Sequence, residues 1–84
     1  MYQKISDPID TLAVFQGRHI RPVRFRWKGR VCKVVEITAR WQTRNGYSRI
    51  HHFTTRDDSQ NFYQIAFDGN RGVWSLTRAW SEDR

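Results

Sequence analysis

The sequence predicts an all-β protein, either a small antiparallel meander or a partly closed barrel of five to six strands. Turn signals recur at close spacing, the clearest being Lys28-Gly29 and Asn45-Gly46. The runs between them are rich in β-branched and aromatic residues, which favour strands. The 84 residues contain no internal repeat, low-complexity stretch or linker. We therefore expect one β domain over residues 1–84, with an ordered core over roughly residues 8–80.

Five runs of residues have strand character by themselves. The first alternates apolar and basic side chains, VRFRW, as a half-buried strand does. The predicted strands cover residues 23–27, 31–41, 47–56, 62–67 and 73–80. Polar turns over residues 57–59 and 68–72 separate the last three.

An earlier segment, residues 8–15, fits two structures. Asp7-Pro8 with Asp10 could cap a short helix. Thr11 and Phe15 are better suited to a strand. We favour the strand, which would be the sixth.

Pairing across the first turn assigns the faces of the sheet. A two-residue loop at Lys28-Gly29 pairs Phe25 with Cys32. The inner face of this hairpin then carries Val23, Phe25, Trp27, Cys32 and Val34. Most of the twelve aromatic residues are expected inside as well, because so short a chain needs large side chains to build a core.

The run 31–41 contains a change of parity. Its later apolar residues, from Val35 to Trp41, also call for burial, so we expect a one-residue bulge near Val34-Val35. The Asn45-Gly46 hairpin then pairs Trp41 with Ile50. The predicted outer face carries Arg24, Arg26, Lys33, Glu36, Thr38, Arg40, Arg49 and His51, with Phe53 beside Thr38.

Positive charge is concentrated in the middle of the chain. The net charge is +7, but residues 11–56 hold eleven Arg or Lys and a single acid, Glu36, which gives +10 there. Twelve of the fifteen basic residues are Arg, whose planar guanidinium suits bidentate contact with phosphate or carboxylate. Arg24 is expected directly opposite Lys33, a like-charge pair that a bound anion would relieve.

The residues that usually carry catalysis or bind metals do not form a site. His51 and His52 are adjacent in a strand and point to opposite faces, and His19 has no ligand at metal-site spacing. Cys32 is a lone cysteine expected in the core. No Gly-rich phosphate loop precedes a helix. We expect no metal, no cofactor and no enzymatic activity.

The location of the protein is predicted from what the chain lacks. No apolar run approaches the roughly 20 residues that a membrane span needs, and the N-terminal residues lack the apolar core of a signal peptide. A single thiol fits a reducing compartment. The expectation is a cytoplasmic protein without a membrane partner.

Charge and aromatic content favour a binding module, with nucleic acid as the predicted partner. The predicted phosphate contacts are Arg24, Arg26, Lys33, Arg40 and Arg49, and the predicted base-stacking residues are Tyr47 and Phe53. The alternative is a protein–protein interaction module that docks through a sheet edge or the C-terminal Trp region. Trp74, Leu76 and Trp80 share one face of a strand and mostly indicate core, but Trp80 at a sheet edge could be an exposed anchor.

Three stretches resemble a family of small bacterial proteins of unknown function. They are residues 22–30 (PVRFRWKGR), residues 34–37 (VVEI) with Trp41, and residues 67–68 (FD) with 72–80 (GVWSLTRAW). A similar pattern occurs as a C-terminal domain of some bacterial proteins related to translesion DNA polymerases. The resemblance covers roughly residues 8–80 and departs at Cys32, where a larger aromatic residue is expected. It implies a bacterial β-rich module linked to DNA repair and supplies no catalytic residues.

Overall fold

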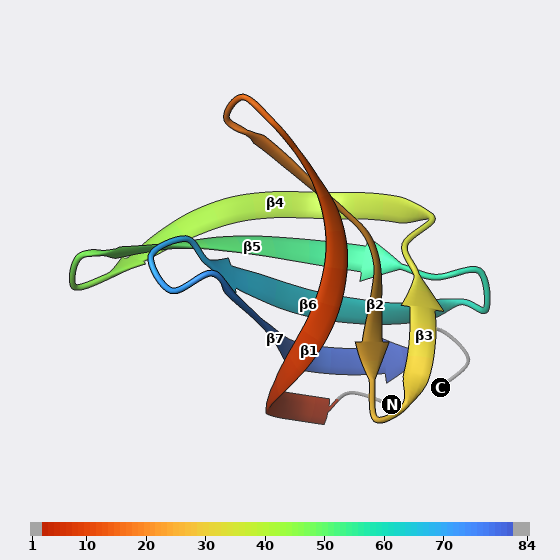
Figure 1. Ribbon diagram of the computed structural model, residues 1–84. Coiled ribbons are helices and arrows are strands. Elements are labelled where there is room, and N and C mark those ends of the chain that lie inside the picture. The colour runs from red at the N-terminus through yellow and green to blue at the C-terminus, as the bar shows by residue number, and fades with distance from the viewer. Residues whose placement is uncertain (1–2, 82–84) are drawn as a thin grey trace.

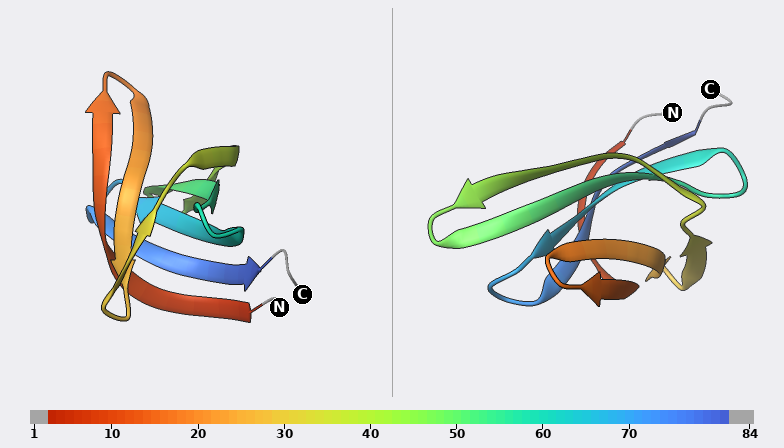
Figure 2. Two further views of the ribbon diagram at one scale, coloured as in Figure 1. Left: turned by 90° about the vertical axis from the view of Figure 1, so that its right-hand side faces the viewer. Right: turned by 90° about the horizontal axis from the view of Figure 1, so that it is seen from above.

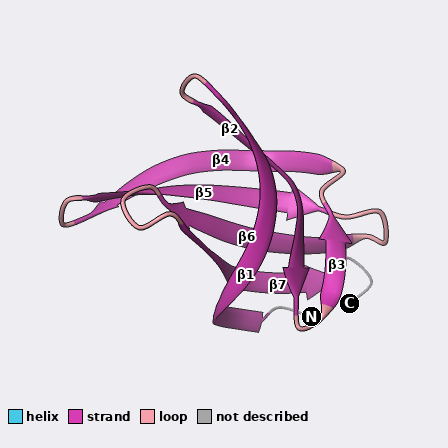
Figure 3. Cartoon of the chain, in the orientation of Figure 1, coloured by secondary structure: helices cyan, strands magenta, loops and turns pink. Residues whose placement is uncertain are grey.

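The computed structural model describes residues 3–81, which form one antiparallel sheet of seven strands (Figure 1, Figure 3). The strands are β1 (Gln3–Gln16), β2 (His19–Trp27), β3 (Arg30–Lys33), β4 (Glu36–Asn45), β5 (Ser48–Arg56), β6 (Asn61–Asp68) and β7 (Val73–Ser81). The predicted all-β antiparallel class is confirmed. The predicted number of five to six strands is wrong, because the run 31–41 forms two strands, β3 and β4.

The sheet is curled but not closed. Its strand order is β3-β2-β1-β7-β6-β5-β4, so β3 and β4, consecutive in the chain, lie at its two opposite ends. Figure 2 shows the β1–β2 hairpin standing across the strands of the other half. The sheet is therefore open and folded, and the partly closed barrel that was one of the two expected architectures does not form. Nothing in residues 3–81 is a helix with the length and apolar character that crossing a membrane requires.

Strand β1 joins the two halves of the sheet. Its first part pairs with β7 as far as Ile9, opposite Trp74, and its second part pairs with β2 from Asp10, opposite Arg26. The strand bends as it changes partner, which folds the sheet over its own inner face (Figure 1). Residues 8–15 are thus a strand, as we favoured, and not a helix.

A corner stands where we expected a bulge, at Val34-Val35. The Val34 amide donates to the carbonyl of Val23 on β2, and the Val35 amide donates to the carbonyl of Arg56 on β5, both at 2.9 Å. Two consecutive amides therefore bond to opposite ends of the sheet. The bulge itself lies further along β4, at Thr38, whose hydroxyl donates to the Thr54 carbonyl at 3.3 Å.

Both predicted hairpins form, but only one has the expected register. Lys28 and Gly29 both have positive φ, as a type I′ turn requires, and Phe25 pairs with Cys32 as predicted. In the second hairpin the loop is Gly46-Tyr47, with positive φ at Gly46 alone, the pattern of a type II′ turn. This shifts the register by two residues, so the predicted pairing of Trp41 with Ile50 is wrong and Trp41 lies opposite His52.

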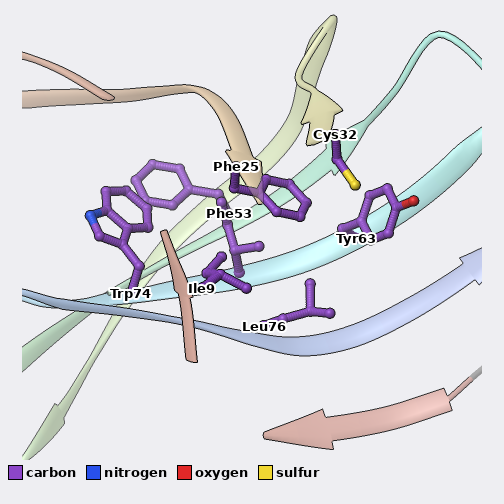
Figure 4. Close-up of a cluster of buried hydrophobic side chains, with 8 residues drawn as sticks. Ile9, Phe25, Cys32, Phe53, Tyr63, Trp74 and Leu76 are labelled. Carbon is purple, nitrogen blue, oxygen red and sulfur yellow. The ribbon is translucent and has the colours of Figure 1, made fainter. Parts of the chain in front are cut away.

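The core fills the space between the two halves. Figure 4 shows Phe25 and Cys32 from the β2–β3 hairpin pointing at Tyr63 on β6. The Phe25 and Tyr63 rings meet edge to face at 5.3 Å between centroids, a favourable aromatic geometry. The buried cluster consists of Ile9, Phe25, Cys32, Phe53, Tyr63, Ile65, Trp74 and Leu76. Burial of Phe25, Cys32, Trp74 and Leu76 confirms the prediction for those positions.

Asp57 organises the turn between β5 and β6. Its Oδ1 accepts the backbone N–H groups of Ser59 at 2.8 Å and Asn61 at 2.9 Å. Its Oδ2 accepts the Asn61 side chain at 3.1 Å and the Tyr63 hydroxyl at 3.4 Å. Burial raises the pKa of this carboxyl, but the hydrogen bonds from Asn61, Ser59 and Tyr63 outweigh burial and hold the pKa of Asp57 below its usual value.

Leu76→Ala should lower the free energy of unfolding by about 2–5 kcal/mol, because Leu76 is fully buried and the substitution leaves a cavity. Val73→Ala, on the same strand but 47% exposed, should change it by no more than about 0.5 kcal/mol. Urea unfolding of both variants measures the difference. Equal losses in the two variants would contradict the assigned inner face.

Asp57→Asn should lower the free energy of unfolding at neutral pH by about 1–3 kcal/mol, because an amide cannot accept all four hydrogen bonds. The folded state holds the pKa of Asp57 below that of the unfolded chain, about 3.9. The stabilisation is therefore complete above that pH and is lost as pH falls through the folded pKa. Unfolding of both proteins at neutral and acidic pH should show the gap closing in acid, and a constant gap would contradict the assignment.

Candidate nucleic-acid interface

A cleft of about 340 Å³ lies in the angle between the β1–β2 and β4–β5 hairpins. One wall comes from residues 18–20 at the end of the β1–β2 hairpin, and the other from residues 40–42 of β4 and 51–53 of β5. Figure 1 shows the two hairpins leaving the core in different directions on either side of this angle. The described lining contains Arg18, Arg40 and three histidines but no acidic residue. The cleft is therefore a concave surface of one charge sign.

The basic character of the cleft continues toward the tip of the β4–β5 hairpin. Side chains on one face of a strand recur every second residue, so Arg40, Gln42 and Arg44 share the inner face of β4. Arg44 lies directly opposite Arg49 on β5. In the part of the chain that the structure describes, no carboxylate forms an ion pair with Arg18, Arg44 or Arg49.

Arg40 connects the two walls of the cleft. Its Nη1 donates to the backbone carbonyl of Ile20 on β2 at 2.8 Å. Its guanidinium lies over the Phe53 ring, 5.7 Å from the ring centroid. Arg40 therefore supports the fold as well as contributing charge, since it links two strands that share no backbone hydrogen bonds.

Phe53 is not the base-stacking residue that we predicted. It is only 3% exposed and stacks on Trp74 at 5.8 Å between centroids. The prediction failed because the bulge at Thr38 reverses the parity of β4 after Ile37. Residues of β4 beyond the bulge lie on the face opposite to the predicted one. The predicted faces of β5 were derived from pairing with β4 and were therefore reversed as well.

The same reversal places Trp41 on the outer face of the sheet. Its ring stacks on His52 with centroids 5.1 Å apart and planes 6° apart, and the residue is 39% exposed. The Nε2 of His52 hydrogen-bonds the Thr43 hydroxyl at 2.8 Å. Burial, with a smaller effect of His51, lowers the pKa of His52, so the ring is neutral at physiological pH.

Tyr47 is at the tip of the β4–β5 hairpin and is 96% exposed. It stands beside the Arg44–Arg49 pair in sequence, two residues from Arg49. Of the two predicted stacking residues, Tyr47 is thus the accessible one. Among described residues, no three His, Cys, Asp or Glu side chains gather where they could hold a metal ion.

The predicted single basic face is in fact two surfaces. Arg24 and Lys33 are directly opposite each other, as predicted, but they lie on the convex side of the β2–β3 hairpin together with Arg26. Arg26 approaches Asp10 at 3.9 Å on the same side. Arg40 and Arg49 lie on the inner face of β4–β5. The structure therefore brings Arg24, Arg26 and Lys33 together in one group, and Arg40 and Arg49 in another.

Sequence reasoning missed two basic residues of this surface, Arg18 in the cleft and Arg44 further along the inner face of β4. Arg18 follows Gly17, whose positive φ marks the β1–β2 turn. That turn signal could have revealed the hairpin and placed Arg18 at its end. Arg44 faces Arg49 only in the observed register of the Gly46-Tyr47 loop, so the error in loop position hid the pair.

Trp80 does not lie at a sheet edge. Strand β7 is interior, between β1 and β6. A bulge at Thr77 moves Trp80 to the face opposite Leu76, where its ring stacks on Phe62 at 5.7 Å and 11°. The predicted shared face for Trp74, Leu76 and Trp80 is thus wrong for Trp80.

No protein-family model matches the chain, and searches of curated proteins and of solved structures found no significant match either. The resemblance inferred from the sequence motifs stays a prediction.

Arg40→Ala should lower the free energy of unfolding by about 1–2 kcal/mol, because it removes the hydrogen bond to Ile20 and the contact with Phe53. Arg44→Ala should leave stability within about 0.5 kcal/mol of the wild type, since no described hydrogen bond or ion pair is lost. Thermal or urea unfolding distinguishes the two. If Arg40→Ala cost no more stability than Arg44→Ala, Arg40 would not be the link between the walls.

Proposed function

We propose that this protein is a small basic accessory module that binds nucleic acid, holding a single strand along the cleft and the inner face of the β4–β5 hairpin. The observation that carries the proposal is the run of arginines from Arg18 and Arg40 in the cleft to the directly opposed Arg44–Arg49 pair further along β4 and β5, with no described carboxylate in the cleft lining. Arg40, Arg49 and Tyr47 keep the roles proposed for them, and Arg18 and Arg44 join them. Phe53 takes no part in base contact.

The charges of this surface favour an anionic ligand. Like charges directly opposite each other on adjacent strands destabilise a sheet, and Arg44 faces Arg49 in this way. A phosphate between the two guanidinium groups would convert the repulsion into two favourable contacts. A concave surface of one sign also concentrates the field that steers an anion toward it.

The shape of the surface favours a single strand over a duplex. A cleft of about 340 Å³ between two hairpins accommodates a narrow chain. Proteins that hold single strands combine a basic groove with aromatic side chains on which bases stack. Tyr47, 96% exposed at the tip of the β4–β5 hairpin, provides such a side chain at this end of the molecule.

Docking of a protein on a sheet edge is the second candidate function. Strand β4 has ten residues and is the last strand of the sheet, and no strand within residues 3–81 pairs with its free edge. An incoming strand could pair there. Its bulge at Thr38 and its arginines are features that natural edge strands use against such pairing. The observations therefore favour nucleic acid, and the suggested link to DNA repair is carried by the sequence resemblance only.

Arg49→Glu should weaken binding of a fluorescein-labelled oligothymidylate by at least about tenfold at about 50 mM salt, because it removes a phosphate contact and places a carboxylate beside Arg44. The same change should raise stability by a few tenths to about 1 kcal/mol, since an opposite-charge pair replaces a like-charge pair. Fluorescence polarisation and urea unfolding measure the two effects.

Arg24→Glu is the matched control. It also replaces one arginine of a directly opposed like-charge pair, Arg24–Lys33, but on the convex surface. Both variants lower the net charge of the protein equally, so the control also measures the effect of net charge. Beyond that effect, Arg24→Glu should change oligonucleotide affinity by less than about twofold. Wild-type affinity should fall steeply with salt. The absence of any binding at low salt would end the proposal, and comparing single- and double-stranded DNA and RNA identifies the preferred form.

A further inference from the structure

The convex side of the β1–β3 strands carries a pattern that the cleft does not use. By register, Arg21, Arg24 and Arg26 form a stripe along the middle strand, β2. Leu12 and Val14 flank the stripe on β1, and Val31 with Lys33 flanks it on β3. We call this set the convex face. It is a row of cations between two rows that carry exposed aliphatic side chains.

The aliphatic side chains of the convex face are well exposed. Leu12 is 52% exposed, Val14 40% and Val31 63%. Leu12 and Val31 also line a depression of about 470 Å³ between the strands. The solvent side of an antiparallel sheet is normally polar. On the convex face, two of three neighbouring strands carry exposed aliphatic residues. Such a group of apolar side chains around one depression indicates a binding surface rather than a face that only contacts water.

The charges of the convex face are poorly balanced. Four cations, Arg21, Arg24, Arg26 and Lys33, are accompanied by one described carboxylate, Asp10, at 3.9 Å from Arg26. The Arg26 and Asp10 side chains are 62% and 85% exposed, so that pair contributes little. Arg24 and Lys33 repel each other directly. The face therefore favours a partner with negative charge.

The chemistry of the face distinguishes between anionic partners. A nucleic acid would benefit from aromatic side chains, and the three apolar residues of this face are Leu and Val. A membrane surface would favour Trp or Tyr anchors, which the face also lacks. Aliphatic side chains next to guanidinium groups instead match a protein segment that presents Leu or Ile together with Asp or Glu.

We propose that the convex face docks an acidic amphipathic helix of a partner protein. Neighbouring strands are about 4.8 Å apart, so β1 and β3 are separated by about 10 Å, close to the diameter of an α-helix. A helix along β2 would place apolar residues on Leu12 and Val31 and on the methylene stems of Arg24 and Arg26. Its acidic residues would pair with the guanidinium heads at the two sides.

This surface is separate from the proposed nucleic-acid cleft, so one chain would join an acidic partner to a bound strand. The two proposals do not depend on each other. Arg24→Glu affects only the convex face and Arg49→Glu only the inner face of the β4–β5 hairpin, because the two residues lie on different faces and different strand pairs.

The test uses two synthetic peptides of identical Glu, Leu and Ala composition. In one, Leu recurs at i, i+3, i+4 and i+7, and in the other the same residues are permuted so that no apolar face forms. The amphipathic peptide should bind the isotope-labelled protein at least about tenfold more tightly than the permuted one. It should shift the amide signals of residues 10–14, 21–26 and 31–33.

Variants identify which property of the face binds. Arg24→Glu and Leu12→Ser should each weaken binding of the amphipathic peptide at least about fivefold. Val73→Ser, which removes a similarly exposed aliphatic side chain on β7, should leave it unchanged. Retained oligonucleotide binding by Leu12→Ser and Arg24→Glu would show that both variants are folded, and the unfolding transition of each shows it independently.

Several results would overturn the proposal. Equal binding of the two peptides would mean that charge alone acts, and absence of peptide binding would mean that the face docks no such helix. Amide shift changes at residues 10–14 and 21–26 on adding oligothymidylate would show that the convex face binds nucleic acid instead. Amide shift changes at the same residues with phosphatidylserine vesicles, and none with the peptide, would show that the convex face binds a membrane surface.

Discussion

The bend of β1 is the constraint on which the rest of the structure depends. One strand pairs with β7 up to Ile9 and with β2 from Asp10, so the two halves of a single sheet must face each other. The space between them has to be filled, and a chain of 84 residues fills it with aromatic rings contributed by both halves. The Val34-Val35 corner holds the far side, where each amide bonds to a different half. No strand pairing closes the sheet there, so its two end strands stay open.

The same bend decides where the positive charge lies. Because β2 and β3 turn their outer face away from β4 and β5, the central basic segment of the chain cannot form one surface. Part of it lines the cleft, where Arg40 links the walls through Ile20 and covers Phe53. The rest forms the convex face with its aliphatic flanks. A chain with a single strongly basic segment thus presents two chemically different surfaces, one concave and one mixed with apolar side chains.

The local sequence pattern was sufficient to predict the features that depend only on residues close together in the chain. The Lys28-Gly29 hairpin has its predicted register, and the inward position of Phe25 and Cys32 follows from it. The change of parity predicted an irregularity at Val34-Val35, but not that it is a corner, and nothing predicted the bulge at Thr38. Both depend on pairing with β5, and neither has a turn residue to mark it. A bulge reverses every side chain beyond it. Because the bulge at Thr38 was missed, Phe53 was predicted on the outer face, although it is in the core, and Trp41 on the inner face, although it is exposed.

The most direct test of this account is the map of amide chemical shifts when oligothymidylate is added to the isotope-labelled protein. The account predicts shifts at residues 18–20, 40–44 and 47–52, along the cleft and the β4–β5 hairpin, and none at residues 24–26 or 31–33 of the convex face. Shifts confined to the convex face would contradict the division of the basic residues into two surfaces with different partners. Shifts spread over both would show that charge alone, and not the cleft, determines binding.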